Sequence, residues 1–91
     1  LRVEVEADSL EQAREAAKAG ADVILLDNMD TATLRRAVAE LGDRVLLEAS
    51  GGITLESISE VAATGVDIIS VGAITHSAPA VDLSLELDPL E

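Results

Sequence analysis

Carboxylate side chains end two consecutive apolar runs of this chain. Glu6 closes the run at residues 3–6, and Asp27 closes the run at residues 23–27. The carboxyl ends of parallel strands meet at one edge of a sheet, where α/β proteins gather their ligands. A carboxylate pair on neighbouring strands can hold Mg²⁺ or accept hydrogen bonds from a ribose diol. The alternative is structural, with Glu6 as a solvated strand end and Asp27 capping the next turn together with Asn28.

Glycine turns follow the next two apolar runs. Ser50–Gly52 comes directly after residues 45–49, and the run at residues 68–72 ends in Gly72, followed by Ala73. Glycine lets the backbone approach a ligand closely, and a helix that starts after the turn supplies free N–H groups and a positive dipole end. Two such turns on neighbouring strands are typical of the phosphate grip of α/β barrels. The alternative is a pair of flexible turns.

Four further charged or ionisable side chains have to be placed inside or outside this site. Glu48 lies one residue before Ala49 and faces either the barrel interior or the helix layer, and a structural ion pair with an arginine is favoured over catalysis. His76 follows the last run and could reach a phosphate, although a lone histidine in a polar loop is usually just exposed. Arg35 and Arg36 fall within a predicted helix, and we expect both on its solvated face.

Helix signals alternate with the strands that would carry these residues. Ser9 and Gln12 form a capping box for the first helix, Asp30 or Thr31 caps the second, and Thr54 caps the third. Each helix carries an apolar stripe, and each is followed by a glycine. The predicted helices span residues 9–19, 31–41 and 55–64, and the glycines that end them are Gly20, Gly42 and Gly65.

The same glycines predict how the strand ends align. The glycine and the strand end are seven residues apart in three successive units, Gly20 to Asp27, Gly42 to Ala49 and Gly65 to Gly72. Equal spacing places the three strand ends side by side at one edge of the sheet.

Residues 1–80 are predicted to form four βα-type units of about 22 residues each, all within one α/β domain. The favoured architecture is a (βα)₄ half of a TIM-type (β/α)₈ barrel with parallel strands, and a four-stranded doubly wound sheet is the rival. Residues 81–91 are predicted to form a short C-terminal strand and tail, because apolar and polar residues alternate between positions 81 and 87.

Composition narrows the class of protein. The chain has 91 residues, a formal charge of −12, no aromatic residue and no cysteine. Nucleic acid and anionic membranes need positive patches, so neither is an expected partner, and the apolar runs are too short to span a bilayer. A cytoplasmic protein is the default expectation. The start at Leu1 and the final Leu90-Glu91 suggest a piece of a longer protein.

Four segments in order resemble one known family. They are Val3–Glu6, Gly20–Met29, Glu48–Thr54 and Ile69–Ala80. They are similar to the C-terminal part of quinolinate phosphoribosyltransferase (nicotinate-nucleotide pyrophosphorylase, carboxylating), and the resemblance covers essentially the whole chain.

The resemblance implies an incomplete (β/α) barrel that works as a homo-oligomer in NAD biosynthesis. It implies a reaction of quinolinate with phosphoribosyl pyrophosphate and Mg²⁺, which yields nicotinate mononucleotide, pyrophosphate and CO₂. By the resemblance, Glu6 and Asp27 contact the ribose and the Mg-pyrophosphate region. The residues that match the phosphate-binding turns are Ser50, Gly51, Gly52, Gly72, Ala73 and Ile74.

What the chain lacks limits what it can do alone. The family's cationic clamp for quinolinate lies upstream and on the partner subunit, whereas this chain holds a single lysine, Lys18. We therefore expect the ribose-phosphate half of the site without activity of its own. The alternative is an excised or engineered half-barrel folding module. Exposed apolar side chains and unpaired strand edges further predict self-association of the isolated chain.

Overall fold

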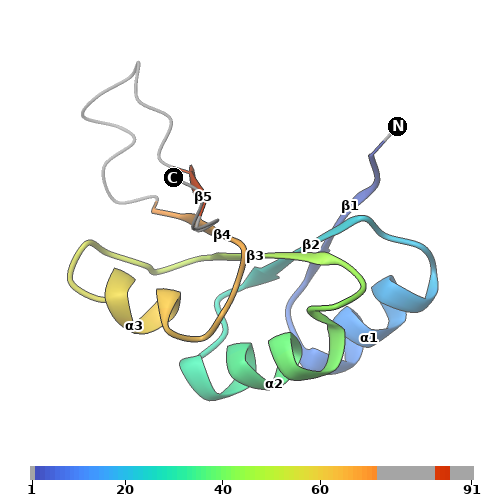
Figure 1. Cartoon of the computed structure of the whole chain (residues 1–91), viewed down its shortest axis with the longest axis horizontal. Coiled ribbons are helices and arrows are strands. Elements are labelled where there is room, and N and C mark those ends of the chain that lie inside the picture. Colours follow the sequence, from blue (N-terminus) through green and yellow to red (C-terminus); the bar gives the residue numbers. More distant parts are fainter. Residues whose placement is uncertain (1, 72–83, 87–91) are drawn as a thin grey trace.

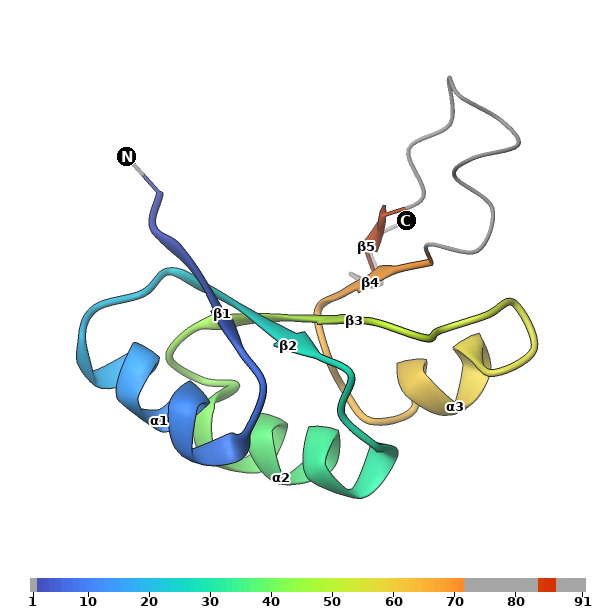
Figure 2. The same cartoon turned by 180° about the vertical axis from the view of Figure 1, so that it is seen from behind.

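The computed structural model describes residues 2–71 and 84–86. Strands and helices alternate from the start of the chain (Figures 1 and 2). The elements are β1 (Glu4–Ala7), α1 (Leu10–Lys18), β2 (Val23–Asp27), α2 (Thr31–Leu41), β3 (Leu46–Ser50), α3 (Ile58–Ala62), β4 (Ile68–Ser70) and β5 (Ser84–Glu86).

The sheet follows chain order, β1-β2-β3-β4-β5, with the first four strands parallel. A right-handed crossover between neighbouring strands always places its helix on the same side when the order never reverses. All three helices accordingly lie under one face of the sheet (Figures 1 and 2). A doubly wound sheet reverses its order and has helices on both faces. The half-barrel prediction is confirmed, and the doubly wound alternative is wrong.

β5 pairs antiparallel with β4, so the predicted C-terminal strand adds to the sheet edge. It occupies residues 84–86 of the predicted span 81–87, and the rest of that span lies outside the described residues. The predicted boundary between residues 1–80 and 81–91 lies there as well and stays a prediction.

The core lies between the sheet and the helices. It is built from alanine and larger aliphatic side chains and contains no aromatic ring. The strand residues Ile24, Leu26, Leu47 and Ile69 are fully buried. Small residues of α1 such as Ala13 let this helix pack close to the strands. Continuous burial of this face fixes the register of every strand, because a slip by one residue would turn its apolar side chains to the other face.

The other face carries no helix within the described residues. We call it the open face. Register and alternation assign it these side chains: Glu4, Glu6, Val23, Leu25, Asp27, Leu46, Glu48, Ser50, Ile68 and Ser70.

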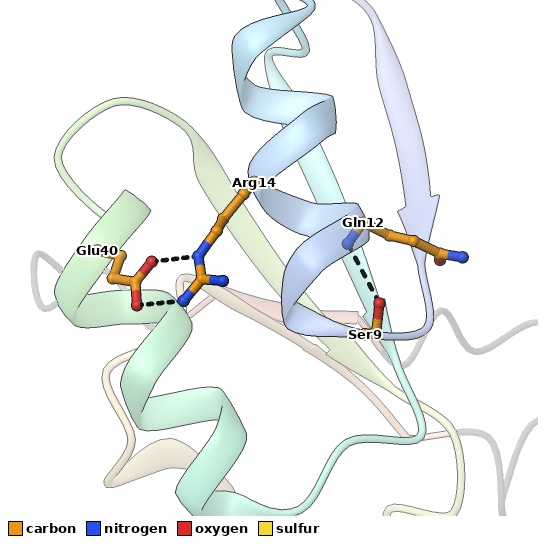
Figure 3. A network of polar contacts seen from close by, with 4 residues as sticks. All are labelled: Ser9, Gln12, Arg14 and Glu40. Carbon is orange, nitrogen blue, oxygen red and sulfur yellow. Dashed lines mark hydrogen bonds and ion pairs between the residues drawn. The ribbon is translucent and has the colours of Figure 1, made fainter.

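Local capping signals are realised as predicted for the first two helices. Ser9 Oγ accepts the N–H of Gln12 at 3.2 Å (Figure 3), and the Gln12 side chain accepts the N–H of Asp8 at 2.8 Å. Asp30, rather than Thr31, caps α2 by accepting the N–H of Thr33 at 2.8 Å. That hydrogen bond holds the pKa of Asp30 below its usual value.

The third helix is shorter than predicted. α3 spans Ile58–Ala62, whereas the sequence predicts residues 55–64. Its N-cap is Ser57 rather than the predicted Thr54, and Ser57 forms no side-chain cap hydrogen bond. Thr54 instead closes the preceding turn, because its Oγ1 accepts the N–H of Ser57 while Ser57 Oγ accepts the N–H of Thr54. These hydroxyls hold residues 55–57 in a turn, since side chains that bond the local backbone compete with the helical pattern.

The predicted alignment of strand ends is wrong. Asp27 pairs with Ser50 rather than with Ala49, and Ala49 pairs with Ile69. Gly20 has a left-handed φ of 99°, but Gly42 has a φ of −61° and continues the right-handed turn of α2. The chain therefore reaches β3 one residue later than it reaches β2, and the shift brings Ser50 level with Asp27.

Candidate functional site

Asp27 and Ser50 lie side by side at the carboxyl edge of the sheet, on the open face. The Ser50 hydroxyl lies 3.4 Å from Oδ1 of Asp27, and both residues are half-buried. The backbone N–H of Asn28 donates to the carbonyl of Ser50 at 2.8 Å. The turn after β2 and the turn after β3 are thus joined into one unit, which brings together two of the predicted site segments.

Gly51 and Gly52 both adopt left-handed backbone, with φ of 87° and 70°. A β-carbon on Gly51 would lie 2.6 Å from Oδ1 of Asp27 and 2.8 Å from the backbone nitrogen of Asn28. Only glycine fits this close approach. Gly52 faces more open space, because the one heavy atom within 4 Å of its hypothetical β-carbon is Oδ1 of Asn28 at 3.7 Å, counted over the described residues other than its chain neighbours. Both glycines are exposed, so the turn presents backbone to solvent.

Glu6 shares the open face with Asp27 but not its level. Glu6 pairs with Leu25, two residues before Asp27, and β1 continues to Ala7. One strand spacing and a two-residue offset separate their Cα atoms by roughly 8 Å. The two residues are therefore diagonal rather than direct neighbours, and their joint contact with one ligand stays a prediction.

Glu48 lies on the open face, and its partner is a hydroxyl rather than an arginine. The Ser70 side chain donates to Oε2 of Glu48 at 2.5 Å, which ties β3 to β4. Among the described residues, the one arginine in an ion pair is Arg14. Its Nε lies 2.7 Å from Oε1 of Glu40, on the helix side of the sheet (Figure 3). The predicted ion pair of Glu48 is therefore wrong.

The open face is strongly anionic. Four of its ten side chains are carboxylates (Glu4, Glu6, Asp27 and Glu48), and none is lysine, arginine or histidine. No group of three or more metal-ligating side chains occurs in the described part of the chain. The carboxylates therefore cannot enclose a cation with protein ligands alone, but they suit Mg²⁺. This ion usually binds one or two protein carboxylates and completes its coordination shell with substrate phosphates and water.

The remaining predicted residues divide into two groups. Arg35 and Arg36 are exposed on α2, as predicted. Arg36 also lines a shallow hollow of about 390 Å³ between the turns after β1 and β2. His76 and the second predicted phosphate turn, Gly72, Ala73 and Ile74, lie outside the described residues, so their roles stay predictions.

Asn28 has a backbone conformation that the sequence analysis does not predict. It has a φ of 59° and is the non-glycine residue with positive φ in the described part of the chain. Asparagine tolerates this conformation better than most residues. An asparagine directly after a predicted strand end is therefore the sequence signal for a left-handed turn at this position.

Comparison with known proteins assigns the fold to a family. The family model described as "Quinolinate phosphoribosyl transferase, C-terminal domain" matches residues 1–86. The chain belongs to this family. The resemblance carried by the four sequence segments is therefore confirmed for quinolinate phosphoribosyltransferase.

Relatives agree with that assignment. A probable nicotinate-nucleotide pyrophosphorylase (carboxylating) of Methanothermobacter thermautotrophicus is 50% identical over 95 residues, which cover 99% of this chain and 34% of that protein. The human nicotinate-nucleotide pyrophosphorylase (carboxylating) is 46% identical over 90 residues, 96% of this chain and 30% of that protein. The chain thus spans about a third of the length of these curated relatives.

Solved structures of the family superpose well. The nicotinate-nucleotide pyrophosphorylase of Francisella tularensis aligns with a TM-score of 0.75 and 46% identity over 79% of this chain and 26% of that one. The enzyme of Ehrlichia chaffeensis gives a TM-score of 0.76 and 38% identity over 81% of this chain and 27% of that one. Within residues 2–71 and 84–86, no helix has the length and apolar character needed to cross a membrane.

Proposed function

We propose that a full-length protein carrying these residues transfers the phosphoribosyl group of phosphoribosyl pyrophosphate to quinolinate. The ring nitrogen bonds to the anomeric carbon, pyrophosphate leaves, and loss of CO₂ yields nicotinate mononucleotide. The observation that carries the proposal is the joined pair of turns at Asp27 and Ser50–Gly52, found in a chain of the quinolinate phosphoribosyltransferase family. The chain supplies the ribose-phosphate half of the site.

The Ser50–Gly52 turn would hold the phosphate on the ribose. Its glycines expose backbone that can donate N–H groups to phosphate oxygens, and such donors need no positive side chain. The predicted second turn, Gly72–Ile74, would complete the grip from the next strand. Backbone N–H donors suit this face, which has no cationic side chain among the described residues. A lysine or arginine there would form ion pairs with the neighbouring carboxylates, whereas a backbone N–H group leaves those carboxylates available to the substrate.

Glu6 and Asp27 would serve the ribose and the pyrophosphate. Ionised carboxylates accept hydrogen bonds, so both can orient the ribose hydroxyls. Asp27 is fixed by the neighbouring Ser50 hydroxyl and by the close packing of Gly51. Mg²⁺, bound through these carboxylates and the pyrophosphate, would neutralise charge on the leaving group.

The quinolinate half would come from elsewhere in the assembly. Two substrate carboxylates would meet four carboxylates on the open face, and an unpaired charge is costly to desolvate. Lysine and arginine side chains outside these 91 residues, or on a second subunit, would supply the positive clamp. A homo-oligomer and a cytoplasmic location are part of the proposal.

Turnover by the full-length protein tests the proposal. Wild-type protein with Mg²⁺, quinolinate and phosphoribosyl pyrophosphate should form nicotinate mononucleotide and CO₂ in equal amounts. Asp27→Asn and Glu6→Gln should each lower kcat/KM by roughly 10²-fold, because each removes a charged acceptor at the reacting sugar. Glu60→Gln, on exposed α3, is the matched control and should leave turnover unchanged. Absence of wild-type turnover would refute the function.

A second role applies to the isolated chain. With no helix over the open face in the described part, the 91 residues resemble a half-barrel module that folds without catalysing. A cooperative denaturation curve without turnover would support this role, and a non-cooperative curve would reject it.

A further inference from the structure

We propose that Asn28 binds the phosphoribosyl substrate, with its carboxamide donating a hydrogen bond to a phosphate oxygen seated over Gly52. This inference rests on the proposed function and extends it to a residue that lies outside the carboxylate pair and the glycine turns.

The position of the carboxamide is the first argument. Among the described residues other than its chain neighbours, Oδ1 of Asn28 is the sole heavy atom within 4 Å of a β-carbon built on Gly52, at 3.7 Å. Among the described residues that point is otherwise open, so it is where a ligand held by the turn would lie. A phosphate there would touch both the Gly52 backbone and the Asn28 side chain.

The backbone of Asn28 fixes that position. Its N–H is bonded to the Ser50 carbonyl at 2.8 Å, and its φ of 59° turns the side chain toward the neighbouring turn. The side chain forms no hydrogen bond with another residue of the described ranges, and the residue is exposed. The carboxamide is thus anchored through its backbone but retains its donors.

Charge explains why an amide is useful here. Asp27 precedes Asn28 directly, and carboxylates dominate the open face, so a phosphate needs neutral donors that do not pair with those acids. An amide carries two N–H donors, and rotation of its terminal torsion exchanges the oxygen with the nitrogen. Aspartate at this position would have the same shape and the same tolerance of left-handed backbone, but it would repel the phosphate.

Two substitutions separate the carboxamide from the backbone conformation. Asn28→Gly keeps the left-handed φ and removes only the side chain. Asn28→Asp keeps the size and replaces donors with a negative charge. Steady-state kinetics of a full-length protein carrying these residues would give the KM for each substrate, and urea denaturation would check the fold.

For Asn28→Gly we expect the KM for phosphoribosyl pyrophosphate to rise about 10- to 100-fold, as for loss of a hydrogen bond to a charged group. Asn28→Asp should raise it further. The KM for quinolinate should stay within about twofold of the wild-type value, because quinolinate does not contact this donor. The denaturation midpoint should equal that of wild type within experimental error, because the fold does not depend on the donor either.

The outcomes are distinct. An unchanged KM for phosphoribosyl pyrophosphate in Asn28→Gly would overturn the binding role and leave only the backbone role. Equal rises of both KM values would also overturn it, since they indicate a structural defect. A wild-type protein without turnover would instead refute the proposed function on which the inference rests.

Discussion

A β-carbon on Gly51 would lie 2.6 Å from Oδ1 of Asp27, so the turn after β3 and the acid that ends β2 are packed as one surface. The proposed phosphate turn and the proposed ribose-binding acid therefore cannot be altered independently. If the proposed roles hold, this contact links the stability of the sheet edge to ligand binding.

Gly51→Ala should destabilise the fold by roughly 2–4 kcal/mol, because it adds both left-handed strain and a steric overlap. Gly20→Ala is the matched control, with a φ of 99° but no atom of the described residues beyond its chain neighbours within 4 Å of the added carbon. It should cost only about 1 kcal/mol from strain. Urea denaturation measures both values, and equal losses would show that the contact with Asp27 is unimportant.

The sequence predicts local features better than the relation between strands. Ser9 and Asp30 are read correctly as caps because a cap involves residues only three apart. The register of β3 was missed because Gly42 resembles Gly20 in sequence but continues the helix. The left-handed backbone of Asn28 was missed for a similar reason, since its turn is completed by Ser50, 22 residues away.

Acid should weaken the contact between α1 and α2. Arg14 donates to both oxygens of Glu40, at 2.7 and 2.9 Å (Figure 3), and this bond lowers the pKa of Glu40. A folded-state pKa below the unfolded value gives stability above the unfolded pKa, which is lost as the pH falls through the folded pKa.

The stability advantage of wild type over Glu40→Gln should therefore be present at pH 7 and vanish in the acid range below about pH 4. Thermal denaturation at several pH values measures it. Glu60→Gln, which removes an exposed carboxylate without an ion pair in the described part, should show no such trend. A pH-independent advantage for Glu40 would contradict the ion pair.

The isolated 91-residue chain should not make nicotinate mononucleotide. Its open face carries four carboxylates and no cation to hold a doubly charged substrate. A coupled assay of pyrophosphate release with purified chain, quinolinate and phosphoribosyl pyrophosphate checks this. Turnover clearly above the no-protein background would overturn it.

The isolated chain should also self-associate. Within the described sheet β5 covers the outer edge of β4, whereas β1 pairs only with β2, and Val3 beside it is 47% exposed. Association should increase with salt, because screening weakens repulsion between chains of charge −12. Val3→Glu adds a like charge at this edge and should shift the equilibrium toward monomer. Sedimentation showing only a 9.4 kDa monomer at all salt concentrations would contradict the prediction.

An NMR titration of the isotope-labelled chain with ribose 5-phosphate and Mg²⁺ tests most directly whether these residues hold the ribose-phosphate half of the site. The amides of Asn28, Gly51 and Gly52 should shift first, since they form the joined turns at the carboxyl edge. The amides of α1, on the far side of the core, should stay in place and serve as the internal control. Uniform shifts across the chain, or none at these three residues, would contradict a ribose-phosphate site here.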